Sequence, residues 1–110
     1  MSLSETMQVT LRLPTQTLFE GAVTRVFAVA EDGAFGMLPN HVDFVTAPVP
    51  SVLILTDAKG IERFFGIDEG VLVKRGHAVE VAIRRGVQGE DLETLNDTVQ
   101  SSFVDRTEHC

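Results

Sequence analysis

Cysteine is almost absent from this chain of 110 residues, and the only one is Cys110, at its end. A single cysteine excludes an intramolecular disulfide framework and a zinc site built from several thiolates. Tryptophan and tyrosine are absent, which removes two of the side chains that commonly stack on bases. No apolar run approaches the ~20 residues that span a bilayer. These absences predict a reduced, cytoplasmic, globular domain.

Basic charge is also scarce. The net charge is −7, whereas a nucleic-acid partner requires a basic face, so no nucleic-acid binding is expected. The charge is unevenly placed, because residues 1–86 carry 8 Lys and Arg against 10 Asp and Glu, a net of −2. Residues 87–110 carry Arg106 against 6 acidic residues, a net of −5. The sequence thus predicts two parts, a nearly neutral body over residues 1–86 and an acidic tail over residues 87–110.

The body shows the two-residue period of β-strands. In MQVTLRL the apolar positions Met7, Val9, Leu11 and Leu13 fall on one face, and in HAVEVAI the inward positions are Val79, Val81 and Ile83. The stretches SVLILTD and IERFFGI flank DAKG, a short turn typical of a hairpin. Gly21, between TLFEG and AVTRVFAVAE, is predicted to be a bend. Short strands separated by regular turns predict a β-sandwich or a barrel.

The tail has the period of a helix. Its apolar residues recur at helical spacing, namely Leu92, Leu95, Val99 and Phe103. Acidic residues crowd its first turn, where the positive end of the helix dipole favours them. An isolated helix of this length is marginal in water. We therefore expect one short C-terminal α-helix that packs its apolar stripe on the body or on a partner.

No constellation of catalytic residues is visible. The three histidines His41, His77 and His109 belong to no HxH, HxxxH or HExxH pattern, so no metal site is expected. Nothing near Ser51 resembles a nucleophile elbow, and two glycines in residues 33–36 are too few for a phosphate-binding loop. The carboxylates are scattered over turns and the tail, so they are expected to be solvated. The residues predict a non-catalytic β-domain without a cofactor that binds other proteins, with a small β-scaffold metal enzyme as the disfavoured alternative.

The order of motifs resembles the epsilon subunit of rotary ATP synthases. FEGAVTRVFAVAEDGAFGMLPNHVDFVTA is similar to the family pattern of a strand, an acidic-Gly turn, a G-apolar-apolar-P-x-H motif and a Thr-Ala pair. FFGIDEGVLVKRGHAVEVA is similar to the end of the family's sandwich. AIRRGVQGEDLETL stands where the family's helical part begins. Each motif is short, but together they cover almost the whole chain in the family's order.

The resemblance implies a mainly β fold, a sandwich of ten strands followed by helical structure. It also implies a non-catalytic subunit of the central stalk, which rotates with the gamma subunit against the ring of c subunits and couples rotation to ATP synthesis or hydrolysis. Membrane association is then expected only through the complex, on the cytoplasmic face of the plasma membrane. The family's usual C-terminal part has two helices, and this chain has room for one. An independent β-sandwich binding module is the alternative that the residues alone also allow.

The resemblance further implies two contact regions. The loop around LPNH faces the gamma subunit in the family, which makes Leu38, His41 and Thr46 the expected gamma contacts. The preceding turn lies near the c ring, which makes Glu31, Asp32, Gly33, Ala34 and Phe35 the expected c-ring contacts. Ala34 stands where several members have an acidic or polar residue. ATP binding is not expected, because the acidic tail offers a phosphate chain only Arg106.

Overall fold

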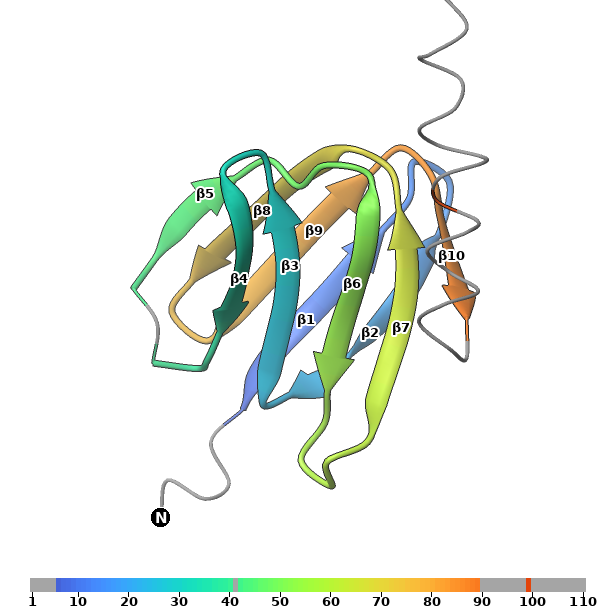
Figure 1. The fold of residues 1–110 in the computed structure, drawn as a ribbon. Coiled ribbons are helices and arrows are strands. Elements are labelled where there is room, and N and C mark those ends of the chain that lie inside the picture. The colour runs from blue at the N-terminus through green and yellow to red at the C-terminus, as the bar shows by residue number, and fades with distance from the viewer. Residues whose placement is uncertain (1–5, 41, 90–98, 100–110) are drawn as a thin grey trace, which may run out of the picture.

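The computed structural model describes residues 6–40, 42–89 and 99, and it forms a sandwich of two five-stranded sheets (Figure 1). Sheet A has the order β2-β1-β9-β8-β5, and sheet B has the order β10-β7-β6-β3-β4. The strands are β1 (Met7–Arg12), β2 (Thr17–Val23), β3 (Arg25–Ala30), β4 (Gly33–Met37), β5 (Phe44–Thr46), β6 (Ser51–Thr56), β7 (Glu62–Ile67), β8 (Gly70–Arg75), β9 (Ala78–Ile83) and β10 (Gly86–Gly89). The predicted fold class, a mainly β protein with a sandwich of about ten strands, is confirmed.

The strands pair antiparallel except for β1 and β9, which run parallel in the middle of sheet A. This pairing sets Val9 beside Val79 and Leu11 beside Val81, with all four side chains buried. The predicted inward faces of the two strands are therefore confirmed, and together they form much of the floor of the core. The opposite wall comes from sheet B, with Val26, Leu53, Leu55, Phe65 and Ile67.

Gly21 is not a bend, and this prediction was wrong. The residue lies inside β2, opposite Val9, and the chain breaks only after Val23. The ring of Phe19 lies over Gly21, because a β-carbon built there would stand 3.2 Å from Phe19 Cζ. A glycine in a strand often marks such a close approach rather than a turn. The same ring makes an edge-to-face contact with Phe65, with ring centroids 5.7 Å apart.

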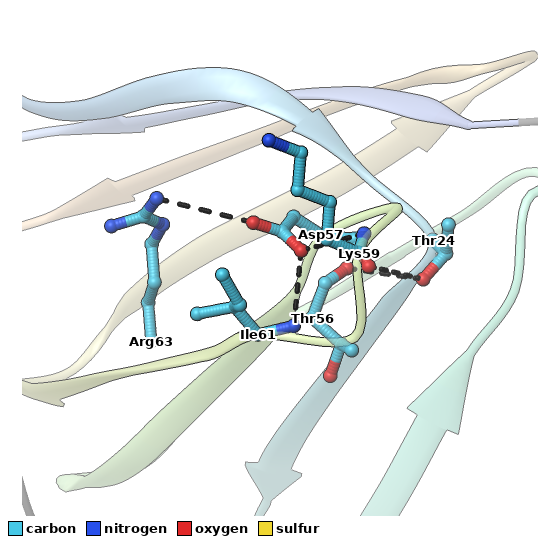
Figure 2. A network of polar contacts seen from close by, with 6 residues as sticks. All are labelled: Thr24, Thr56, Asp57, Lys59, Ile61 and Arg63. Atoms are coloured by element: carbon cyan, nitrogen blue, oxygen red, sulfur yellow. Dashed lines mark hydrogen bonds and ion pairs between the residues drawn. The ribbon is translucent and has the colours of Figure 1, made fainter.

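The predicted hairpin of β6 and β7 is confirmed, and its turn is closed by Asp57 (Figure 2). Asp57 Oδ1 accepts hydrogen bonds from the backbone N–H groups of Lys59, at 2.9 Å, and Ile61, at 3.0 Å. Thr24 Oγ1 donates to the carbonyl oxygens of Thr56 and Asp57, at 3.2 and 3.3 Å. The polar side chains at this end of the sandwich thus satisfy the backbone of their own connections.

Strand β10 was not predicted. It runs from Gly86 to Gly89 and pairs antiparallel with β7. The sandwich therefore continues past residue 86, the last residue of the body that the charge distribution predicted. Beyond it the structure describes Val99, which is buried against Val52 with Ile54 and Phe64 beside it. The other predicted helix-packing residues, Leu92, Leu95 and Phe103, lie outside the described residues. Within the described part of the chain, no helix is long and apolar enough to span a membrane.

Candidate functional site

The turn between β3 and β4 presents the residues that the sequence assigns to the c ring. Ala30 pairs with Gly33, so Glu31 and Asp32 form a two-residue hairpin loop, and both are exposed. Gly33 has a φ of 133°, a backbone conformation that side chains disfavour, which explains the glycine after two acidic residues. Ala34 is exposed and Phe35 is half-buried. The loop therefore forms an acidic tip at one end of the sandwich (Figure 1).

The fold places Thr46 beside this tip. Strand β5, which ends at Thr46, is the edge of sheet A, whereas β4 is the edge of sheet B. The two edges are joined by an edge-to-face contact between Phe35 and Phe44, with ring centroids 5.6 Å apart. An open hollow of about 460 Å³ lies between them and is lined by Ala30, Asp32, Gly33, Ala34, Phe35, Phe44, Val45 and Thr46. Thr46, one of the expected gamma contacts, thus lies beside the expected c-ring contacts, whereas Leu38 follows β4 at the other end of that strand.

The connection from β4 to β5 exposes apolar side chains. Leu38 is 53% exposed, Val42 is 73% exposed and Val45, in β5, is 67% exposed. The connection is tied down at its end, because Asp43 Oδ1 accepts a hydrogen bond of 2.8 Å from the backbone N–H of Gly76 in the turn before β9. His41 lies outside the described residues. Several large apolar side chains exposed on one short segment are typical of a surface that another protein covers.

The sequence analysis missed a buried charge cluster, which joins the turn after β7 to the turn after β9. Asp68, in the turn from β7 to β8, is only 3% exposed, so the expectation of solvated carboxylates was wrong for this residue. Its Oδ2 accepts from Arg85 Nε at 3.0 Å and forms ion pairs with the Nη2 atoms of Arg85, at 2.9 Å, and Arg84, at 3.4 Å. Its Oδ1 accepts from the backbone N–H of Glu69 at 2.8 Å. The fold pairs the carboxylate with cations that lie far along the chain.

The environment of Asp68 favours its charged form. Burial raises the pKa of Asp68, but the hydrogen bond from the Glu69 backbone and the guanidinium groups of Arg85 and Arg84 outweigh it. The net effect holds the pKa of Asp68 below its ordinary value of 3.8. A carboxylate stabilised in this way keeps its proton off at neutral pH and is a poor general acid or base. The cluster is therefore structural.

The other candidates for chemistry also have backbone roles. Ser51 Oγ donates to the carbonyl oxygen of Val49 at 2.7 Å, and the carbonyl oxygen of His77 accepts from the backbone N–H of Gln8 at 2.7 Å. Over residues 6–40 and 42–89, together with Val99, no three His, Cys, Asp or Glu side chains gather closely enough to hold a metal ion. No described non-glycine residue has a positive φ.

Known proteins with the same fold and related sequences agree with this description. The family model for the β-sandwich domain of the ATP synthase Delta/Epsilon chain matches residues 6–89. An ATP synthase epsilon chain 2 from Paraburkholderia xenovorans (strain LB400) is 35% identical over 102 residues, which cover 91% of this chain and 73% of the relative. An ATP synthase epsilon chain 2 from Cereibacter sphaeroides is 39% identical over 93 residues, which cover 81% of this chain and 64% of the relative.

A solved structure shares the fold at lower sequence identity. A chain in the Euglena gracilis mitochondrial ATP synthase, described as OSCP/F1/c-ring, superposes with a TM-score of 0.74 at 18% identity, covering 88% of this chain and 63% of that chain. This chain therefore spans less than two thirds of the Cereibacter relative and of the Euglena chain. The family model covers the whole described sandwich, from residue 6 to the end of β10. The chain belongs to the Delta/Epsilon chain family of the ATP synthases.

Proposed function

We propose that this protein is a non-catalytic subunit of the central stalk of a rotary ATP synthase, linking the gamma subunit to the c ring and coupling rotation to ATP synthesis and hydrolysis. Family membership, given by the match over residues 6–89, is the observation that carries the proposal. The Tetrahymena thermophila structure with this fold is itself described as central stalk and c ring, and it superposes with a TM-score of 0.63 at 18% identity. The chain would then act at the cytoplasmic face of the membrane and reach it only through the complex.

The gamma subunit is proposed to cover the exposed apolar segment. Leu38 and Val42, in the connection from β4 to β5, and Val45, next to Thr46 in β5, expose apolar surface, and apolar surface that water must otherwise solvate favours burial on a partner. Leu38, His41 and Thr46, predicted as gamma contacts, all belong to this segment or border it. Burying these side chains on gamma would stabilise the complex without requiring any charge on the partner.

The c ring is proposed to meet the acidic tip of the β3–β4 hairpin. Glu31 and Asp32 are exposed there, with Gly33 and Ala34 exposed beside them and Phe35 half-buried behind. A small alanine in place of a charged residue leaves the two preceding carboxylates as the charged groups of this tip. Such exposed charges orient a contact and set its salt dependence more than its strength. Weakening by salt should therefore distinguish this contact from the apolar one on gamma.

The test is co-purification with the gamma subunit of the same synthase. Val45→Asp places a charge in the proposed gamma contact, and Ile61→Asp is the matched control, because Ile61 is a 52% exposed apolar residue in the turn between β6 and β7, outside the proposed contact. We expect Val45→Asp to weaken gamma binding by roughly tenfold or more, as for a buried hot-spot residue. Ile61→Asp should leave it unchanged. Equal binding by both variants, with unchanged melting temperatures, would refute the assignment of this surface to gamma.

A further inference from the structure

Strand β5 is a short edge strand that depends on anchors outside itself. It has three residues, Phe44–Thr46, and pairs with β8 at the edge of sheet A (Figure 1). Three residues form few backbone hydrogen bonds, and an edge strand has a neighbour on one side only. Phe44 is half-buried against Phe35, but Val45 is 67% exposed, so burial of its own side chains gives the strand limited support. Its position on the sheet therefore depends on how its two ends are held.

The chain that leaves β5 is fixed by backbone contacts with sheet B. Ala30, at the end of β3, forms an isolated antiparallel bridge with Pro48, which is buried. The backbone N–H of Val49 donates to the carbonyl oxygen of Val29 at 3.0 Å. These contacts follow Thr46 closely along the chain, so they hold the C-terminal end of the strand.

The chain that enters β5 is fixed by a side chain instead. Asp43, the residue before Phe44, is exposed, and its Oδ1 accepts a hydrogen bond of 2.8 Å from the backbone N–H of Gly76. Gly76 lies in the turn between β8 and β9 with a φ of 61°, the left-handed conformation that glycine adopts without steric cost. The bond joins residues 33 positions apart, so it fastens the start of β5 to a distant turn of the same sheet.

Lys74 holds the same turn from inside the sandwich. It lies opposite Phe44 in the register of β5 and β8, and it is 2% exposed. A buried ammonium group needs acceptors for its protons, and Lys74 Nζ donates to the carbonyl oxygen of Gly76. The backbone of Gly76 thus donates to the side chain of Asp43 and accepts from that of Lys74. The turn is therefore a firm support for the start of β5.

We propose that Asp43 is a positioning residue for the gamma contact, and that it acts by fixing the start of β5 to the turn at Gly76. Val42 and Val45, which stand on either side of Asp43 in the chain and are exposed, are then in place before gamma binds. A preordered surface loses less conformational entropy on binding than the same side chains on a frayed strand, so it binds more tightly. The inference rests on the proposed function, because it assigns a role in the contact with gamma.

The test combines hydrogen exchange of the isolated chain with the gamma affinity of the same variants. Asp43→Ala removes the acceptor, whereas Asp43→Asn keeps an acceptor oxygen without the charge. Lys74→Met removes the ammonium group of a residue that is too deeply buried to touch a partner. The matched control is Asp57→Ala, which removes a turn aspartate that also accepts from the backbone but lies outside the proposed contact. Exchange of the amides of Gly76 and of residues 44–46 reports opening of this edge.

We expect Asp43→Ala to speed exchange at Gly76 and in β5 and to weaken gamma binding, each by about fivefold, the factor that one ordinary hydrogen bond supplies. Asp43→Asn should restore most of both. Lys74→Met should shift exchange and affinity in the same direction as Asp43→Ala. Asp57→Ala should change neither, and Val45→Asp should weaken binding without speeding exchange at Gly76.

Unchanged exchange in Asp43→Ala would overturn the anchor. Faster exchange with unchanged gamma affinity, in Asp43→Ala or in Lys74→Met, would overturn the positioning role. Equal weakening of gamma binding by Asp43→Ala and Asp43→Asn, with wild-type exchange in Asp43→Asn, would make Asp43 a direct charge contact instead. Failure of the wild-type chain to bind gamma would refute the proposed function and the positioning role with it, and this result is distinguishable from the others because it requires no variant.

Discussion

Two aspartates follow neighbouring strands of sheet B and have opposite roles. Asp57 ends β6 and accepts from backbone N–H groups two and four residues ahead, with its side chain 21% exposed. Asp68 ends β7 and pairs with guanidinium groups 16 and 17 residues ahead, with its side chain 5% exposed. The first closes its own turn, and the second joins two corners of the sandwich. The same residue type thus stabilises a single turn in one place and holds together two turns that are distant in sequence in the other.

The largest expected effect is at the long-range aspartate. Asp68→Ala removes the carboxylate that accepts from Arg84, Arg85 and the Glu69 N–H, and it should lower the free energy of unfolding by about 2–3 kcal/mol, as for a lost hydrogen bond to a charged group. The side chains of Arg85 and Arg84 are 34% and 59% exposed, so both can turn to water when the carboxylate is lost. This keeps the loss in stability below that of a fully buried ion pair. Urea denaturation at neutral pH measures the change. A loss as small as that of an ordinary surface substitution would show that the buried pair adds nothing net.

Acid should act through the same aspartate. The pKa of Asp68 is lowered in the folded protein, so its contribution to stability is present above the unfolded-state value of 3.8 and is lost as the pH falls through the folded-state pKa. Asp68→Asn cannot ionise at this position. We therefore expect the difference in free energy of unfolding between wild type and Asp68→Asn to be largest at neutral pH and to shrink below about pH 4. Urea midpoints over that range measure it. A gap that stays constant into acid would exclude charge as its cause.

The local aspartate should be less sensitive. Asp57→Ala leaves the N–H groups of Lys59 and Ile61 without their acceptor, but both lie at an exposed turn where water can replace it. The expected loss is about 1 kcal/mol, as for a capping residue. Asp57→Asn retains an acceptor oxygen and should lose only a few tenths of that. Thermal melting of the two variants sharpens the comparison, because asparagine should substitute well at 57 and poorly at 68.

The smallest effect is expected at an exposed pair. Arg12 Nη2 and Glu80 Oε2 are 2.9 Å apart in the middle of sheet A, closer than the Asp57–Arg63 pair at 3.9 Å, but both side chains are half exposed. Glu80→Gln should change the free energy of unfolding by less than about 0.5 kcal/mol, and added salt should erase the difference. Chemical denaturation at low and high salt measures both. A loss comparable to that at Asp68 would mean that distance, rather than burial, determines the value of an ion pair here.

The candidate site was partly predictable. The tip at Glu31 and Asp32 and the exposed apolar residue Leu38 follow from a resemblance carried by short motifs, and the structure places these residues at the surface. That Thr46 would lie across a shared hollow from Gly33 could not be predicted, because β4 and β5 belong to different sheets. No periodicity within either strand encodes which edges of two sheets meet.

The sequence by itself determined the alternating strands β1 and β9, with their inward faces, and the β6–β7 hairpin with its turn at Asp57, because these depend on residues a few positions apart. Alternation placed Val9, Leu11 and Val81 in the core, and the structure agrees. Only the tertiary structure decided that Gly21 is covered by an aromatic ring, that residues 86–89 form a strand, and that Asp68 is buried with Arg85. Each of these depends on a neighbour supplied by the fold, and the burial that makes a charge costly or valuable exists only once the two sheets have closed over it.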